Sequence, residues 1–178
     1  MNIRCLVPIA ALAVCALHAQ NPMSMEAKQS WDRTKNNVIA AAAKMPEEHY
    51  NFKPSPESQS FKDLVAHTAD STMGTCSSYN GERKQAGAAA KTTKAELTAV
   101  LAEGMAECDK MYASMTDAVA TEMIPGRGGQ NTRLAALYRN IIHIEHEYAQ
   151  MAVHLRLKGL VPPSSEGRGG GGGGRKKQ

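Results

Sequence analysis

Hydrophobic and polar positions alternate with the period of an α-helix in four long segments of the chain. In each segment the apolar residues recur at spacings near three, four and seven, and no proline interrupts the pattern. Most of the Pro and Gly lies in the loops between the segments. The segments cover residues 24–45, 60–81, 93–115 and 132–158. Four amphipathic helices of about this length predict an all-α fold, a four-helix bundle.

Signals at the helix ends support the same boundaries. Ser60 with Asp63, and Thr93 with Glu96, have the spacing of capping boxes, in which a side-chain oxygen satisfies a free backbone N–H of the first turn. Gly159, followed by "VPP", is a typical helix end. The stretch "MIPGRGGQN" before the fourth helix is predicted to be a loop, and the chain shows no strand-like alternation that would favour an α/β fold.

The fourth helix carries two stripes of side chains. One is the predicted core face, and it consists of Leu137, Ile141, Ile144, Tyr148, Met151 and Leu155. The other is polar, is expected almost opposite the first, and consists of His143, Glu147, Gln150 and His154, with His146 beside it. We therefore expect the polar stripe not to compete with the core. A solvated helix face is the simplest interpretation of such a stripe.

The polar stripe also has the spacing of metal ligands. Side chains at i and i+4 lie over one another, so His143 and Glu147 could bind one ion, and His143 with His146 is another pair. Catalytic metal sites typically have three protein ligands and one open position. A third ligand must therefore come from another helix, and His67 is the best candidate, since it lies midway along the second helix between small alanines.

Other kinds of chemistry find little support. The chain has no G-x-S-x-G, P-loop, G-x-G-x-x-G or C-x-x-C motif. Residues 20–165 carry 16 Lys plus Arg and 16 Asp plus Glu, so the net charge of +4 arises from the two ends of the chain. No nucleic-acid partner is expected, because the body of the protein has no excess of positive charge.

The two ends are predicted to lie outside the folded domain. Residues 1–19 combine Arg4, an apolar run and small residues near Ala19, which is the pattern of a secretory signal peptide. Residues 20–165 form the predicted bundle, and residues 166–178 form a Gly-rich basic tail that we expect to be disordered. The mature protein is expected to be exported, to the periplasm or the extracellular space, and to lack a transmembrane span.

Two cysteines remain after the signal peptide, Cys76 and Cys108. In an exported protein they could form a disulfide, provided that their helices are neighbours. They could equally be two small buried hydrophobic residues.

Two stretches of the chain resemble a known family. "SFKDLVAHTADSTMGTCS" and, some 75 residues later, "NIIHIEHEYAQMAVHLRLKGLVPPSSE" are similar to the DinB/YfiT-like family, especially to its exported bacterial members. The resemblance implies an up-down-down-up four-helix bundle, often a homodimer, in which three histidines hold a divalent ion such as nickel or zinc at an open pocket. It also implies an unidentified small-molecule substrate, since characterised relatives include thiol-dependent transferases and isomerases.

The resemblance assigns ligands residue by residue. His67 matches the ligand of the second helix and His143 the first ligand of the fourth helix. The family usually has another histidine four residues further on, where this chain has Glu147, preceded by His146. Three alternatives follow: Glu147 is the third ligand, in a set that also suits iron; His146 is the third ligand; or the site has lost its metal. The protein is accordingly expected to be either a metal-dependent hydrolase or thiol transferase, or a non-enzymatic bundle with a binding or stress-related role.

Overall fold

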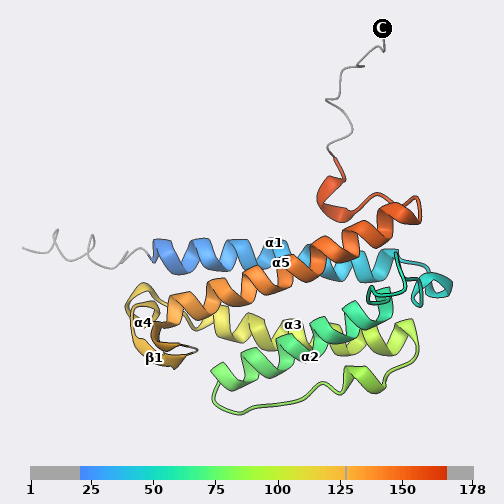
Figure 1. The fold of residues 1–178 in the computed structure, drawn as a ribbon. Coiled ribbons are helices and arrows are strands. Elements are labelled where there is room, and N and C mark those ends of the chain that lie inside the picture. Colours follow the sequence, from blue (N-terminus) through green and yellow to red (C-terminus); the bar gives the residue numbers. More distant parts are fainter. Residues whose placement is uncertain (1–20, 127, 168–178) are drawn as a thin grey trace, which may run out of the picture.

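A computed structural model describes residues 21–126 and 128–167 of the protein (Figure 1). Its long helices are α1 (Pro22–Lys44), α2 (Phe61–Tyr79), α3 (Lys94–Ala113) and α5 (Arg133–Leu157). Helices α1 and α5 run in one direction, and α2 and α3 run in the other. The predicted up-down-down-up four-helix bundle is therefore confirmed, and every predicted helix end lies within two residues of the observed one.

Short elements complete the described part of the chain. They are three 3₁₀ turns, the one-turn helix α4 and a hairpin: η3 (Glu47–His49), η4 (Ala88–Ala90), α4 (Asp117–Ala120), β1 (Met123–Gly126), β2 (Gly129–Thr132) and η5 (Pro163–Ser165). The predicted signal peptide and the tail from residue 168 onward lie outside the described residues. Within the described part of the chain, no helix has both the length and the apolar character needed to cross a membrane.

The predicted capping boxes are present at both helix starts. Ser60 Oγ accepts a hydrogen bond from the backbone N of Asp63 at 3.1 Å, and Thr93 Oγ1 accepts one from the backbone N of Glu96 at 3.2 Å. In return, each carboxylate accepts a hydrogen bond from the backbone N of its capping residue. These bonds begin α2 and α3 at the positions that the sequence predicts.

An aromatic pair connects three of the helices in the core. The rings of Trp31 on α1 and Tyr112 on α3 stack with their centroids 5.0 Å apart. The Trp31 indole N–H donates to Asp109 at 2.8 Å, and the Tyr112 hydroxyl donates to the carbonyl oxygen of Leu137 on α5 at 2.8 Å. Each large ring therefore buries its apolar surface and still satisfies its polar atom.

Helices α2 and α3 approach each other very closely at Gly104. A Cβ atom at this position would lie 2.4 Å from Thr72 Oγ1 and 2.9 Å from the carbonyl oxygen of Ala69, so only glycine allows this distance between the helices. A Cys76–Cys108 disulfide joins the same two helices. The two cysteines are therefore joined in a disulfide and are not two separate buried thiols.

Because α2 and α3 run in the same direction, their connection must return along the whole length of α2. Residues 80–93 form this crossover segment, which passes beside α2 and includes η4 (Figure 1). The Asp70 carboxylate on α2 accepts hydrogen bonds from the backbone N of Ala88 at 2.9 Å and of Ala89 at 3.3 Å. These two bonds hold the crossover segment against the helix.

The hairpin corrects the prediction of a plain loop between α3 and α5. Strands β1 and β2 pair antiparallel from Met123 with Thr132 to Gly126 with Gly129. Gly128 and Gly129 have φ angles of +85° and +129°, which suit glycine and allow the tight turn. Each strand has only four residues and none of them is buried, so the hairpin leaves the all-α class unchanged.

Replacing both cysteines with alanine should lower the free energy of unfolding. The bridge joins residues 32 positions apart, and a closed loop of this size corresponds to about 3 to 4 kcal/mol of stabilisation. Urea unfolding of the C76A/C108A protein, compared with the native protein, measures the difference. Two alkylated thiols in the native protein without reductant would contradict the disulfide.

Replacing Gly104 with alanine should destabilise the bundle by about 1 to 3 kcal/mol, because the new methyl group must push α2 and α3 apart. Gly74 is the matched control, since it is also helical but a Cβ there would have no neighbour nearer than 3.9 Å. G74A should be neutral or stabilising by up to about 1 kcal/mol, as expected for a freely accommodated Gly to Ala change in a helix. Thermal unfolding of both variants checks the contrast, and equal effects would count against the close contact.

Candidate metal centre

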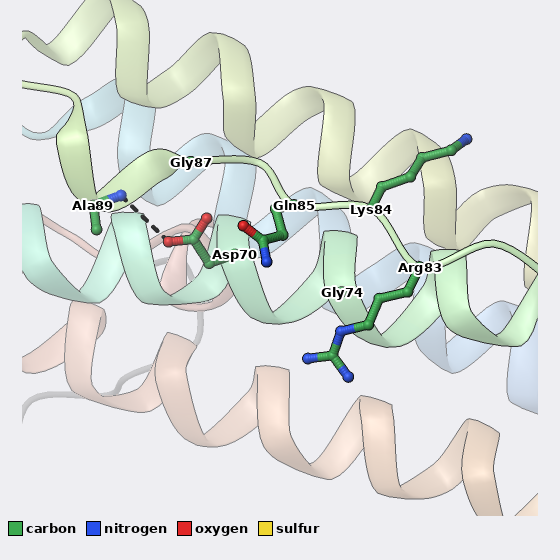
Figure 2. Close-up of a pocket in the computed structure, with 7 residues that line it drawn as sticks. All are labelled: Asp70, Gly74, Arg83, Lys84, Gln85, Gly87 and Ala89. Atoms are coloured by element: carbon green, nitrogen blue, oxygen red, sulfur yellow. Dashed lines mark hydrogen bonds between the residues drawn. The ribbon is translucent and has the colours of Figure 1, made fainter.

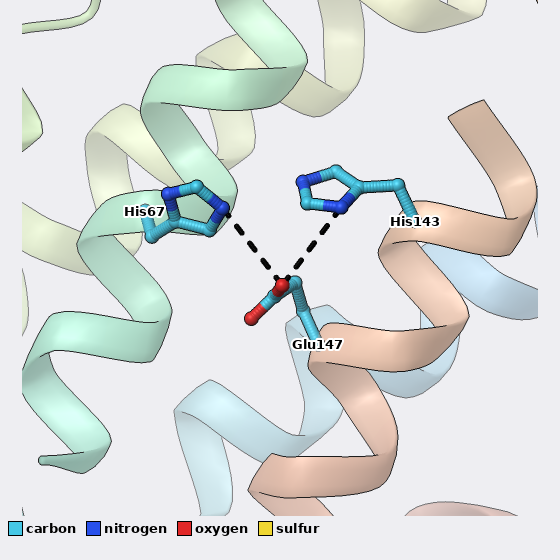
Figure 3. A group of neighbouring side chains, drawn as sticks. All are labelled: His67, His143 and Glu147. Carbon is cyan, nitrogen blue, oxygen red and sulfur yellow. Dashed lines mark ion pairs between the residues drawn. The ribbon is translucent and has the colours of Figure 1, made fainter. Parts of the chain in front are cut away.

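Three potential ligand side chains from two helices meet in the gap between α2 and α5. Helix α2 supplies His67, and α5 supplies His143 and Glu147 from successive turns (Figure 3). Glu147 Oε1 lies 3.8 Å from His67 Nε2 and 3.8 Å from His143 Nδ1. One potential ligand atom from each residue lies within 4.8 Å of the others. The group could therefore hold a metal ion.

The three side chains differ in their exposure. The Glu147 side chain is 5% exposed, whereas those of His143 and His67 are 40% and 47% exposed. The carboxylate therefore forms the floor of the group and the two imidazoles form its rim. The open side lies at the histidines, where solvent or a small molecule can reach the group.

Glu147 is held in place by both of its oxygens. Oε1 faces the two imidazoles, and Oε2 accepts a hydrogen bond from Gln150 Nε2 at 3.3 Å. A buried carboxylate is costly unless it has partners, and here every partner comes from α2 or α5. Gln150 thus orients the carboxylate from one turn further along α5, as outer groups often do for metal ligands.

The environment of His143 favours its neutral form. Partial burial lowers the pKa of His143 below its ordinary value, and the neighbouring His67 and His146 act in the same direction, whereas Glu147 acts to raise it. A neutral imidazole has a free nitrogen lone pair, which is the form that binds a metal. The site therefore keeps His143 ready to act as a ligand near neutral pH.

The polar stripe of α5 is not the solvated face that its residue pattern suggests. At about 100° per residue, its centre lies about 110° from the centre of the core stripe, not opposite to it. Helix α5 packs against α1 on one side and α2 on the other, and the polar stripe faces α2. Both Glu147 and His154 are consequently buried, and the expectation of a fully solvated stripe was wrong.

His154 belongs to a separate interaction. Its Nδ1 lies 2.9 Å from the carbonyl oxygen of Gln150, and its Nε2 lies 3.1 Å from the carbonyl oxygen of Gln59. The ring therefore attaches the segment before α2 to α5. His146, the fourth residue of the predicted ligand set, is exposed and is not part of the group of His67, His143 and Glu147.

The family model of the DinB superfamily matches residues 30–151, which is more than half of the chain. The chain belongs to the DinB superfamily. No curated protein sequence matches it.

Several solved structures share the fold of this DinB superfamily member. A DinB-like protein from Bacillus cereus is 18% identical, with a TM-score of 0.64, and the match covers 77% of this chain and 93% of that one. A DinB-like protein from Bacillus subtilis is 18% identical, with a TM-score of 0.60 and coverage of 75% and 92%. A conserved protein from Enterococcus faecalis is also 18% identical, with a TM-score of 0.61 and coverage of 75% and 95%. At this level of identity the likeness concerns the fold.

The donor set of this DinB superfamily member fits a divalent metal ion. Two imidazole nitrogens and one carboxylate oxygen occur together in catalytic zinc sites and in the iron sites of non-haem oxygenases. Ligand atoms about 2.1 Å from a tetrahedral ion lie roughly 3.4 Å from one another. The two distances of 3.8 Å to Glu147 Oε1 are within a few tenths of an ångström of that value, and all three ligand atoms lie within 4.8 Å of one another.

In the metal-free protein, replacing Glu147 with glutamine should lower the pKa of His143 further. The carboxylate is the neighbour that raises this pKa, and its removal leaves burial and the two histidines to act unopposed. Titration of the histidine ring signals by NMR measures the change. An unchanged or higher pKa in E147Q would show that the carboxylate does not face the imidazole in solution.

Proposed function

We propose that His67, His143 and Glu147 bind one divalent metal ion, zinc, nickel or iron, and that this site makes the protein a metal-dependent enzyme acting on a small molecule. The observation that carries the proposal is the convergence of three potential ligand atoms, from two helices, within 4.8 Å of one another. Membership of the DinB superfamily supports it, since the three residues lie in the matched region.

The reaction that suits this site best is hydrolysis or thiol transfer. A bound divalent ion polarises a substrate carbonyl and lowers the pKa of a coordinated water or thiol. The chain contributes the remaining functions: Gln150 orients the Glu147 carboxylate, burial keeps His143 neutral, and the half-exposed histidines leave one side open for the substrate. These features correspond to a catalytic site with an open position rather than to a closed structural one.

The proposal includes export. The Cys76–Cys108 disulfide supports a location outside the cytosol, because such bonds persist in oxidising compartments and are rare in the cytosol. The periplasm and the extracellular space both meet this condition.

Metal uptake by the purified mature protein tests the proposed site. The native protein should bind one equivalent of Zn²⁺, Ni²⁺ or Fe²⁺ after reconstitution, as measured by elemental analysis and calorimetric titration. The variants H67A, H143A and E147Q should each lose affinity by about 100-fold or more, since loss of even an outer partner of a metal ligand costs about 10- to 100-fold.

The control is H146A. His146 lies next to Glu147 in sequence but outside the group, so its replacement should change the affinity less than about threefold. Substoichiometric metal in the native protein with all three ions would rule out the metal site and favour the non-enzymatic bundle. An H146A variant as weak as H143A would instead make His146 a ligand.

A further inference from the structure

One face of α2 is lined by polar or small residues over its whole length beyond His67. Asp70, Ser71, Gly74 and Ser78 follow His67 at spacings of three, four, seven and eleven, so all of them lie on the same side of the helix. None of these residues contributes a large apolar side chain. The stripe begins at the candidate metal centre and runs toward the C-terminal end of α2.

Three adjoining pockets lie along this stripe, and Asp70 lines all of them. The first, of about 280 Å³, includes His67. The second, of about 370 Å³, lies between α2 and the crossover segment (Figure 2). The third, of about 980 Å³, extends past Ser78 to Pro125 of β1. Together they form an open polar groove, here called the α2 groove, which reaches the candidate metal centre at His67.

Arg83 is one of the positively charged side chains that line the α2 groove, with Lys62 in the first pocket and Lys84 in the second. Its side chain leaves the crossover segment and passes across α2 at Gly74, on the way to the side that faces α5 (Figure 2). Its Nη2 atom lies 4.0 Å from the position that a Cβ of residue 74 would occupy. The guanidinium thus lies close to the helix surface, at a distance where even a methyl group at residue 74 would be in ordinary van der Waals contact with it.

The other charged groups beside Arg83 already have partners. The Asp70 carboxylate accepts the backbone N–H groups of η4, and Lys84 points toward α3 (Figure 2), where its Nζ lies 3.5 Å from Glu107 Oε2. The ion pairs between described residues do not include Arg83. Its exposed guanidinium is therefore free to bind an anion from outside the chain.

We propose that the α2 groove binds the substrate of the candidate metal centre and that Arg83 recognises a carboxylate at the far end of that substrate. This inference rests on the proposed function and adds the substrate class to it. Arg83 acts as a specificity residue, because a planar guanidinium offers two parallel N–H groups to the two oxygens of a carboxylate.

The groove also sets the length of the substrate. His67 and Gly74 are seven residues apart on α2, and a helix rises 1.5 Å per residue, so the metal-binding group and the carboxylate should be separated by about 10 Å. This is about the span of three extended amino-acid residues. The expected substrate is therefore an elongated, polar, peptide-sized molecule with a metal-binding group at one end and a carboxylic acid at the other.

A series of N-acetyl-cysteinyl peptides tests both the charge and the length. The peptides carry zero to four glycines after cysteine and end in a carboxylate or an amide, and calorimetry measures their dissociation constants with the zinc-loaded protein. With two or three glycines the carboxylate form should bind about fivefold more tightly than the amide, as expected for an exposed ion pair. In R83Q this preference should disappear, while zinc affinity should stay at the native value.

The control is R33Q, which removes the same charge from an exposed position on α1 and should retain the full preference. A carboxylate preference that persists in R83Q, or that is absent at every length, overturns the inference. A series ending in phosphonate that binds tenfold more tightly than the carboxylates overturns the assignment of the anion as a carboxylate.

The two proposals fail separately. If the native protein takes up no metal, the proposed function fails, and the same peptides are titrated into the metal-free protein. If the metal-free protein prefers the carboxylate peptides and R83Q does not, an anion site in the α2 groove is still supported. If the metal-free protein shows no such preference, the inference is overturned.

Discussion

The parallel direction of α2 and α3 is the constraint on which the rest of the structure depends. Neighbouring helices that run in the same direction cannot be joined by a short turn, so residues 80–93 must return beside α2. Gly104 and the Cys76–Cys108 bridge draw the two helices together, and Asp70 attaches the returning segment through the backbone of η4. The same topology that demands a long connection thus builds one wall of the α2 groove and places Arg83 on it.

Helix α2 packs against α3, and the side of α2 that carries His67 faces α5 instead. The buried carboxylate of Glu147 on α5 lies 3.8 Å from His67 across this gap and 3.8 Å from His143 on its own helix. Burial affects the members of the group differently: it favours neutral His143, and it requires partners for the carboxylate, which Gln150 and the histidines provide. A site of this kind is prepared before any ligand arrives, because the bundle holds each side chain from a rigid helix.

Most of the fold could be predicted from the sequence, because helices depend on local patterns. Periodicity and capping residues act within a few positions, and all four long helices and both capping boxes agree with the structure. The hairpin at Met123–Thr132 was missed, because its strands are short, contain no buried residue and carry no alternating apolar pattern. The polar stripe of α5 was misplaced for another reason. At about 100° per residue its centre lies about 110° from that of the core stripe, not opposite to it, and a helix in a bundle contacts two neighbours, so its buried surface is wider than one apolar stripe.

The candidate site, like the fold, could be predicted from the sequence only in part. The sequence by itself determined that His143 and Glu147 lie on one face of a helix, since their spacing of four is a property of helix geometry. The tertiary structure decided that His67, 76 positions before His143, meets them across the bundle, that His146 lies outside the group, and that the polar stripe faces α2. Spacing along a helix is set by local hydrogen bonds, whereas the meeting of two helices depends on how they pack. Only the packed bundle could show that a glutamate expected in solvent is the buried member of the group.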